Sequence, residues 1–290
     1  MKPLKTVILT TGGTIACRYD PTTGGLKPAV SGEDLIAAVP GLGDASEIEV
    51  EQFSNIPGDY FTPDLWLMLS RRVNDLLERP DVSGAVITHG TDTMEETAFF
   101  LDLTLQSEKP VVLTGAQRNA STPDADGPRN ILDSVKVASS HEAKNKGAMI
   151  CMNGQINSAR YATKTHTYGV ETFQSGEVGF LGVVTPVGVT FYHKPLYRRS
   201  FKVERVEPVV DIIAAYSGID SRLIDAAVQS GAGGIVIQAM GIGNLSDGIY
   251  DGIVRAIQAG VPVVISTRVH RGRVVPLYSF KGGGKSTLQA

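Results

Sequence analysis

Four stretches of the sequence carry side chains that could perform nucleophilic chemistry. The first is Thr10–Ala16, in which Gly12 and Gly13 stand directly before Thr14. A glycine pair lets the backbone turn tightly and expose N–H groups that can hold an oxyanion or a carboxylate, here beside the hydroxyl of Thr14. Taken alone, the stretch also fits a glycine turn with hydroxyl capping.

The second stretch, Thr88–Glu96, contains His89, Thr91 and Asp92. Asp92 fits either a catalytic carboxylate or the N-cap of the following helix, where acids satisfy free N–H groups. His89 follows an apolar run and precedes Gly90, so it fits a packed, hydrogen-bonded histidine as well as a catalyst. The spacing alone leaves both interpretations open.

The third stretch is Thr114–Arg118, followed by Asp124–Asn130, whose acids and glycine are typical of turns and caps. The fourth is the irregular segment 154–175, in which Lys164 lies among threonines. A lysine beside a carboxylate and a threonine can activate a weak hydroxyl nucleophile, although Lys164 alone also fits a solvated surface charge. Three of these stretches follow predicted strands, where parallel sheets bind ligands, and this convergence favours catalysis.

Short runs rich in Val and Ile alternate with segments of helical period. The predicted strands are Val7–Leu9, Ala85–Thr88, Val111–Thr114, Ala148–Met152, Val209–Ile213, Gly234–Gln238 and Val261–Ser266. The predicted helices are Leu35–Val39, Leu65–Leu77, Met94–Leu105, Pro128–Ser139, Ser221–Gln229 and Asp247–Ala259. Ser31 and Thr62 are expected to cap the first two helices, the second with Pro63 at its first position. Continuous apolar strands separated by helices predict an α/β fold with mainly parallel sheets and right-handed crossovers.

The alternation stops between about residues 154 and 208 and resumes at Val209. We therefore expect a large N-terminal α/β domain over residues 1–187, a linker over 188–207 and a smaller C-terminal α/β domain over 208–290.

Composition narrows the function classes. The chain has 290 residues, of which 42% are hydrophobic and 20% charged, and its formal net charge of −3 gives no basic footprint for nucleic acid. No apolar run is long enough to span a bilayer and no signal segment is visible, so we expect a cytoplasmic protein without a membrane partner. Cys17 and Cys151 are expected to be two buried free thiols. Neither a metal-binding cluster nor a dinucleotide fingerprint is present, and Ser279 replaces the glycine that a phosphate loop at 280–287 requires.

The loop sequences also resemble a known family. The matching motifs are Ile8–Ala16, Gly84–Met94 with its continuation to Thr104, Pro110–Gln117, Asp126–Pro128, Thr163–Thr165 and Gly241–Leu245. On these motifs the chain resembles the bacterial-type L-asparaginases, the asparaginase/glutaminase family, over nearly its whole length. The resemblance implies an amidohydrolase that converts L-asparagine to L-aspartate and ammonia, with weaker activity on glutamine or D-asparagine and no metal or organic cofactor.

The resemblance also assigns roles to residues. Thr14 would be the nucleophile, and Thr91, Asp92 and Lys164 would form a second hydroxyl–carboxylate–ammonium set. Backbone N–H groups near Thr91 or at Ala116 would polarise the substrate carbonyl. The remaining substrate-binding residues would be Gly13, Gly58, Asp59, Gly90 and Asn244. Family members are usually homotetramers built from dimers, so a homotetramer or homodimer is expected, with Asn244 approaching a neighbour's site.

Three departures from the family pattern concern substrate recognition and length. Gly24-Gly25-Leu26 stands where the family has a loop tyrosine, and Tyr19 is the nearby tyrosine. Gly58-Asp59 stands where the family has a Ser-Gln pair that grips the substrate α-carboxylate. The C-terminal domain is expected to lack the family's last helix. These departures leave open two alternatives: the same chemistry on another ω-amide, or a catalytically impaired small-molecule sensor.

Overall fold

The structure is a computed structural model that describes residues 4–207 and 209–289. The chain divides between Arg205 and Val206 into two compact units, and each is described by itself. Pro208, the predicted first residue of the smaller domain, and Ala290 lie outside the described residues.

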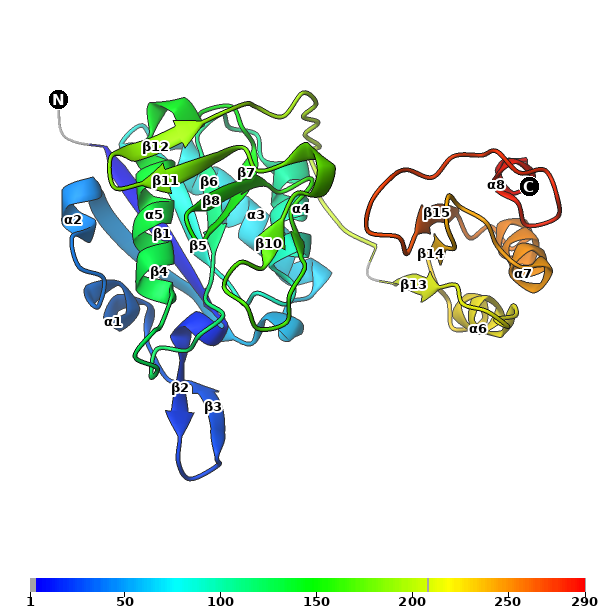
Figure 1. Cartoon of the computed structure of the whole chain (residues 1–290), viewed down its shortest axis with the longest axis horizontal. Coiled ribbons are helices and arrows are strands. Elements are labelled where there is room, and N and C mark those ends of the chain that lie inside the picture. The colour runs from blue at the N-terminus through cyan, green and yellow to red at the C-terminus, as the bar shows by residue number, and fades with distance from the viewer. Residues whose placement is uncertain (1–3, 208, 290) are drawn as a thin grey trace. The chain divides into compact units, whose positions relative to one another are not determined.

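The large unit is built on one sheet of eight strands in the order β12-β11-β8-β7-β6-β5-β1-β4 (Figure 1). The strands are β1 Lys5–Gly12, β4 Glu47–Ile56, β5 Val82–Thr88, β6 Val111–Thr114, β7 Ala148–Met152, β8 Gln155–Ser158, β11 Gly182–Thr185 and β12 Gly188–Phe191. Neighbours from β4 through β7 pair in parallel, whereas β8, β11 and β12 add an antiparallel end. The prediction of a mainly parallel sheet is confirmed. β12 lies within the range predicted as linker.

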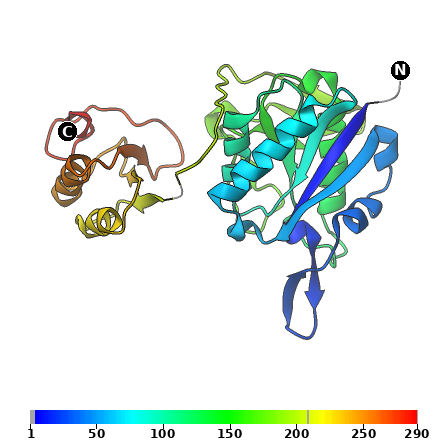
Figure 2. The same cartoon turned by 180° about the vertical axis from the view of Figure 1, so that it is seen from behind.

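Helices cover both faces of this sheet (Figures 1 and 2). One face carries α3 Pro63–Glu78 and α4 Met94–Thr104; the other carries α1 Gly32–Ala37, α2 Leu42–Ala45 and α5 Gly127–Ser139. Successive residues of β1 point to opposite faces, so Val7 and Leu9 join one core cluster and Ile8 the other. Burial on both faces explains why the central strands are continuously apolar.

The predicted helix starts are confirmed at two places. The Thr62 hydroxyl accepts a hydrogen bond from the backbone N–H of Leu65 at 3.4 Å, with Pro63 as the first residue of α3. The Ser31 hydroxyl accepts one from the N–H of Asp34 at 3.1 Å and opens α1. These caps satisfy N–H groups that a helix leaves free at its first turn.

The rest of the large unit consists of short elements. Within residues 4–207 the 3₁₀ turns are η1 Thr14–Ala16, η2 Gly58–Tyr60, η3 His141–Ala143 and η4 Gly176–Val178. The two small hairpins are β2 Cys17–Asp20 with β3 Gly25–Pro28, and β9 Thr163–Lys164 with β10 Phe173–Gln174. The β2–β3 hairpin projects from the body of the unit (Figure 1).

The small unit has a parallel three-stranded sheet in the order β13-β14-β15. Its elements are β13 Val210–Ala214, α6 Arg222–Gln229, β14 Gly234–Ala239, α7 Asp247–Gln258, β15 Val263–Thr267 and α8 Gly284–Leu288. Its core is mainly isoleucine: Ile213, Ile224, Ile235, Ile237, Ile249 and Ile253 are all buried. The predicted parallel α/β arrangement is confirmed here too.

Two chain-wide expectations have mixed outcomes. Cys17 and Cys151 are both free thiols, and Cys151 is fully buried. Cys17 is only half-buried because it opens the projecting β2–β3 hairpin, so the prediction of two buried thiols is wrong for this residue. Within residues 4–207 and 209–289, no helix has both the length and the apolar character that crossing a bilayer requires.

Candidate active site

Three glycines from separate loops meet beyond the carboxyl ends of β1, β4 and β5. A Cβ added to Gly13 would lie 2.4 Å from the Cα and N of Gly90. A Cβ on Gly90 would lie 2.8 Å from the Cα and N of Gly58. Side chains at these positions would therefore force the three backbones apart. Gly13, Gly58 and Gly90, predicted as binding residues, are brought into one contact.

The loop after β1 is held in place by its neighbours. The Thr11 hydroxyl donates to the carbonyl of Thr88 at 2.8 Å, and the Gly13 N–H donates to the carbonyl of Ile56 at 3.1 Å. Gly13 has φ +81° and ψ −176°, a conformation essentially confined to glycine. Thr14 follows as the half-buried first residue of η1. Thr14 directly follows Gly13, and Thr91 directly follows Gly90, the glycine that Gly13 contacts.

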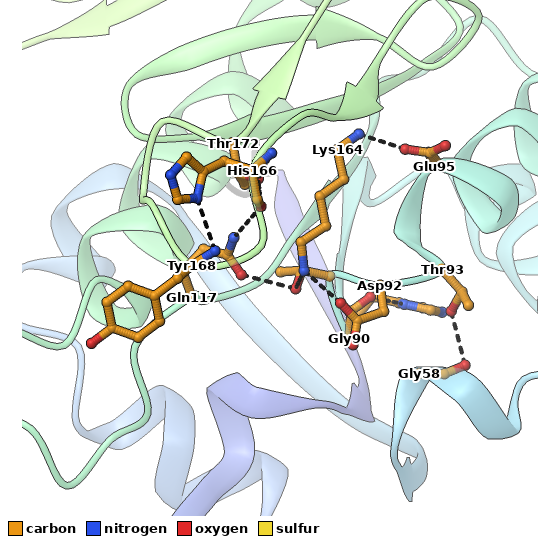
Figure 3. A network of polar contacts seen from close by, with 12 residues as sticks. Gly58, Gly90, Asp92, Thr93, Glu95, Gln117, Lys164, His166, Tyr168 and Thr172 are labelled. Atoms are coloured by element: carbon orange, nitrogen blue, oxygen red, sulfur yellow. Dashed lines mark hydrogen bonds and ion pairs between the residues drawn. The ribbon is translucent and has the colours of Figure 1, made fainter. Parts of the chain in front are cut away.

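Thr91, Asp92 and Lys164 form one polar group, of which Figure 3 labels Asp92 and Lys164. The Lys164 ammonium donates to Thr91 Oγ1 at 2.9 Å and to Asp92 Oδ1 at 2.5 Å. Thr91 is buried, whereas the side chain of Asp92 is 68% exposed and that of Lys164 15% exposed. Asp92 is not a helix cap, since Thr93 occupies that position, and Lys164 is not a free surface charge. The chain thus holds an ammonium against a buried hydroxyl and an open carboxylate.

Glu95 places Lys164 from the first turn of α4 (Figure 3). One carboxylate oxygen accepts from the Thr163 hydroxyl at 3.1 Å, and the other accepts from the backbone N–H of Lys164 at 2.5 Å. Lys164 is therefore held at two places, because its backbone N–H donates to Glu95 and its ammonium donates to Asp92. The two-residue pairing of β9 with β10 supplies the remaining support.

His89 is a packed, hydrogen-bonded histidine. It is fully buried, and its ring lies 4.5 Å from that of Phe61. Because the carbonyl of Gly90 only accepts, the contact of 2.8 Å between it and Nδ1 assigns the proton to Nδ1, so Nε2 accepts from the Thr97 hydroxyl at 3.0 Å. Burial lowers its pKa to about 4 and keeps the ring neutral. His89 thus orients the Gly90 carbonyl directly before Thr91.

The third predicted loop lies against the same place. A Cβ on Gly115 would lie 2.6 Å from the carbonyl of His89 and 3.1 Å from the Thr91 methyl group, and buried Ala116 follows. Asp126 fixes the next two residues, because its carboxylate accepts from the N–H of Gln117 at 3.2 Å and of Arg118 at 2.9 Å.

The loop after β4 also borders the site. Thr93 Oγ1 donates to the carbonyl of buried Gly58 at 2.8 Å (Figure 3), and Asp59 is exposed within η2. A recess of about 370 Å³ opens beside the ion pair. Its lining residues are Asp92, Glu95, Lys164, Thr165, His166 and Thr167. A larger recess of about 720 Å³, along residues 36–48, contains none of the predicted site residues.

Asn244 belongs to the small unit. Its backbone pairs with that of Met240, and its side-chain carbonyl accepts from the N–H of Gly284 at 3.4 Å. The residue is half-buried in a turn between β14 and α7. Across residues 4–207 and 209–289, no group of three or more His, Cys, Asp and Glu side chains is placed to hold a metal ion.

Fold and site together define a two-unit α/β protein that gathers a hydroxyl, a carboxylate and an ammonium at the carboxyl ends of parallel strands. Two family profiles match: "Asparaginase, N-terminal" over residues 5–197 and "Glutaminase/Asparaginase C-terminal domain" over 209–290. The chain belongs to the asparaginase family, which confirms the predicted resemblance.

Named relatives agree with this assignment. L-asparaginase 2 of Bacillus subtilis (strain 168) is 43% identical over 279 residues, which cover 93% of this chain and 74% of that protein. L-asparaginase 2 of Escherichia coli (strain K12) is 37% identical over 273 residues, which cover 91% and 78%. The crystal structure of a probable cytoplasmic L-asparaginase from Campylobacter jejuni superposes with a TM-score of 0.89 at 36% identity, covering 98% of this chain and 88% of that one.

The site also contains residues to which sequence reasoning gave no role. Glu95, Gln117 and Asp126 contact the backbone or side chains of the predicted site residues. Their only sequence signal was membership of the motifs that carry the resemblance.

Proposed function

We propose that the chain hydrolyses the side-chain amide of L-asparagine, releasing L-aspartate and ammonia. The observation that carries this proposal is the Lys164 ammonium bound to both Thr91 Oγ1 and Asp92 Oδ1, beside the contact of Gly13 with Gly90. A hydroxyl next to an ammonium–carboxylate pair is a recognised way to activate a weak nucleophile or a water molecule.

In the proposed mechanism Thr14 is the nucleophile. Its oxygen attacks the amide carbon and its hydroxyl proton passes to the amide nitrogen, so that an ester forms as the C–N bond breaks and the nitrogen leaves as ammonia. Water then cleaves the ester and restores the Thr14 hydroxyl. Backbone N–H groups near Thr91 or at Ala116 stabilise the oxyanion of each tetrahedral intermediate.

Proton transfer in this mechanism is assigned to the second set, Thr91, Asp92 and Lys164. The ammonium of Lys164 donates a charge-assisted hydrogen bond to the Asp92 carboxylate and polarises the Thr91 oxygen. Thr91 has little contact with bulk water, so these interactions act in a medium of lower dielectric.

The proposal is tested by ammonia release from L-asparagine, D-asparagine, L-glutamine and other ω-amides. We expect turnover of L-asparagine by the wild type and a loss of at least about 10³-fold in Thr14→Val, which keeps the side-chain shape. Thr190→Val, the same change at an exposed position of β12, serves as the matched control. Equal activity of wild type and Thr14→Val would exclude Thr14 as nucleophile. Aspartate binding without turnover of any amide would identify a sensor instead.

A second candidate keeps the chemistry and changes the substrate to another ω-amide. Asp59 favours it, because an exposed carboxylate directly after Gly58 repels an α-carboxylate and attracts an α-ammonium. We expect asparagine derivatives with an amidated α-carboxylate to be accepted, and Asp59→Asn to lower the KM for L-asparagine. A micromolar KM of the wild type for L-asparagine would remove this candidate.

We further propose a cytoplasmic homo-oligomer, a tetramer or a dimer, in which Asn244 completes a neighbour's site. The Campylobacter jejuni protein, a probable cytoplasmic L-asparaginase, supports this compartment, whereas a similar protein of Haemophilus influenzae is a probable periplasmic L-asparaginase. Light scattering gives the number of copies. Mixing Thr14→Val with Asn244→Leu should restore part of the activity through hybrid assemblies, and a mixture as inactive as its parts would contradict a shared site.

A further inference from the structure

Gln117 connects the buried Thr91 hydroxyl to the loop that follows Lys164, and Figure 3 shows Gln117 beside His166 of that loop. Its side-chain carbonyl oxygen accepts from Thr91 Oγ1 at 3.1 Å. Its amide nitrogen donates to the backbone carbonyls of His166 at 3.3 Å and Gly169 at 3.2 Å. One side chain therefore makes three contacts that join two separate segments of the site.

The orientation of the Gln117 amide is determined by its partners. Backbone carbonyls only accept hydrogen bonds, so the end that faces His166 and Gly169 must be the NH₂ group. The end that faces Thr91 must then be the carbonyl oxygen, which carries no proton. The two loop contacts thus decide which atom Thr91 meets.

This orientation in turn fixes the direction of the Thr91 hydroxyl. The Lys164 ammonium can only donate, and Gln117 Oε1 can only accept. Thr91 has a single hydroxyl proton, which must go to Gln117, leaving its lone pairs for Lys164. The hydrogen bonds run in one direction, from Lys164 through Thr91 to Gln117.

We propose that Gln117 is a positioning residue for the reaction, one that holds the Thr91 proton so that the Thr91 oxygen faces Lys164. The backbone carbonyls of His166 and Gly169 determine which end of the Gln117 amide faces Thr91. The proposal rests on the proposed function, because it assigns Gln117 a part in amide hydrolysis.

Water cannot replace Gln117 readily at this position. Thr91 is only 4% exposed, so few other acceptors are available to its hydroxyl. Without the Gln117 oxygen, the hydroxyl turns toward another acceptor and its lone pairs leave Lys164. Small displacements of catalytic groups reduce rates by up to about 10²-fold, so the effect should be measurable.

The test compares two variants that both loosen residues 163–172, the segment that contains Lys164 and the loop that follows it. Gln117→Met keeps the length of the side chain but removes all three contacts. Thr172→Val is the matched control, because the Thr172 hydroxyl donates to the carbonyl of His166 at 2.5 Å but has no contact with Thr91. Hydrogen exchange at the Thr165 amide, which donates to the Thr172 carbonyl at 2.7 Å, reports loop loosening in both variants.

We expect about tenfold faster exchange at the Thr165 amide in both variants. Only Gln117→Met should lower kcat, by about 10- to 100-fold with KM changed less than about threefold. An unchanged kcat in Gln117→Met, or an equal loss in Thr172→Val, would overturn the positioning role.

The wild type separates this proposal from the proposed function. If it releases no ammonia from any amide, the proposed function fails and the catalytic role of Gln117 fails with it. If it is active and only the Gln117→Met result disagrees, the proposed function stands. Unchanged exchange at Thr165 in Gln117→Met would refute the contacts with the loop independently of turnover.

Discussion

Adding one methyl group to each of three glycines tests whether the loops of the site depend on direct backbone contact. Gly13→Ala introduces both a clash, at 2.4 Å from Gly90, and a side chain at φ +81°. Gly90→Ala introduces a clash alone, at 2.8 Å from Gly58. Gly24→Ala introduces strain alone, since Gly24 has φ +66° and nothing lies within 4 Å of the added atom.

The expected magnitudes follow from these two contributions. Strain at positive φ costs about 1–2 kcal/mol for an alanine, and forcing extra atoms into a packed region costs about 1–3 kcal/mol. Gly13→Ala should therefore lose about 2–5 kcal/mol, and each of the other two variants less. For a unit of about 200 residues, 1 kcal/mol corresponds to roughly 2–4 °C in Tm.

Calorimetry and ammonia release measured on the same preparations complete the test. Gly24→Ala should lower Tm by a few degrees and keep the activity. Gly90→Ala and Gly13→Ala should lose activity at temperatures where they remain folded, because the added methyl group separates the segments that carry Thr14 and Thr91. Full activity in both variants, with Tm no lower than that of Gly24→Ala, would refute the close contact.

Three further predictions concern the groups around this contact. Burial lowers the pKa of His89 from 6.5 to about 4, so the unfolded chain binds the proton more tightly than the folded chain does. The free energy of unfolding is therefore highest above pH 6.5 and should fall by roughly 3 kcal/mol as the pH drops toward 4. His89→Gln should flatten that slope in Tm against pH, and an unchanged slope would contradict the assignment. Glu95→Ala leaves the Lys164 N–H without its partner and should lower kcat/KM by about tenfold or more, whereas Glu108→Ala, at an exposed acid outside the site, should leave it unchanged. Thr62→Ala should cost about 1 kcal/mol by loss of the α3 cap, seen as a small fall in Tm with no change in kcat.

The central strands and their helices could be predicted because their burial determines their residue types. β5 and β6 are covered on both faces, so they show as apolar runs. β4 was missed because it is an edge strand with alternating acids, which read as polar sequence. In the fold these acids are ion-paired: Glu49 with Arg79 at 2.6 Å and Glu51 with Arg72 at 2.6 Å. Partners about 20 to 30 residues away in sequence cannot be inferred from a local pattern.

The site shows the same division between local and distant information. The grouping of Thr91, Asp92 and Lys164 matches the expectation drawn from the resemblance, but their roles stay a proposal. Spacing alone could not decide whether His89 was catalytic or packed, because the answer lies in Phe61 and Thr97, on other elements. Gln117 carried no local signal, since its contacts depend on where a loop about 50 residues later folds back.

Residues at the start of α4 hold Lys164 in position, although Lys164 belongs to an irregular segment. Asp92 directly precedes Thr93, the N-cap of α4, and Glu95 lies in the first turn of that helix. Asp92 binds the ammonium of Lys164 and Glu95 binds its backbone N–H. The backbone and the ammonium of Lys164 are thus both held by residues at the start of α4, in addition to the two-residue strand pairing around it. Changes within residues 165–172 should therefore move the recess wall more than they move the ammonium, which is why a loosened loop and a misdirected Thr91 can be separated by experiment.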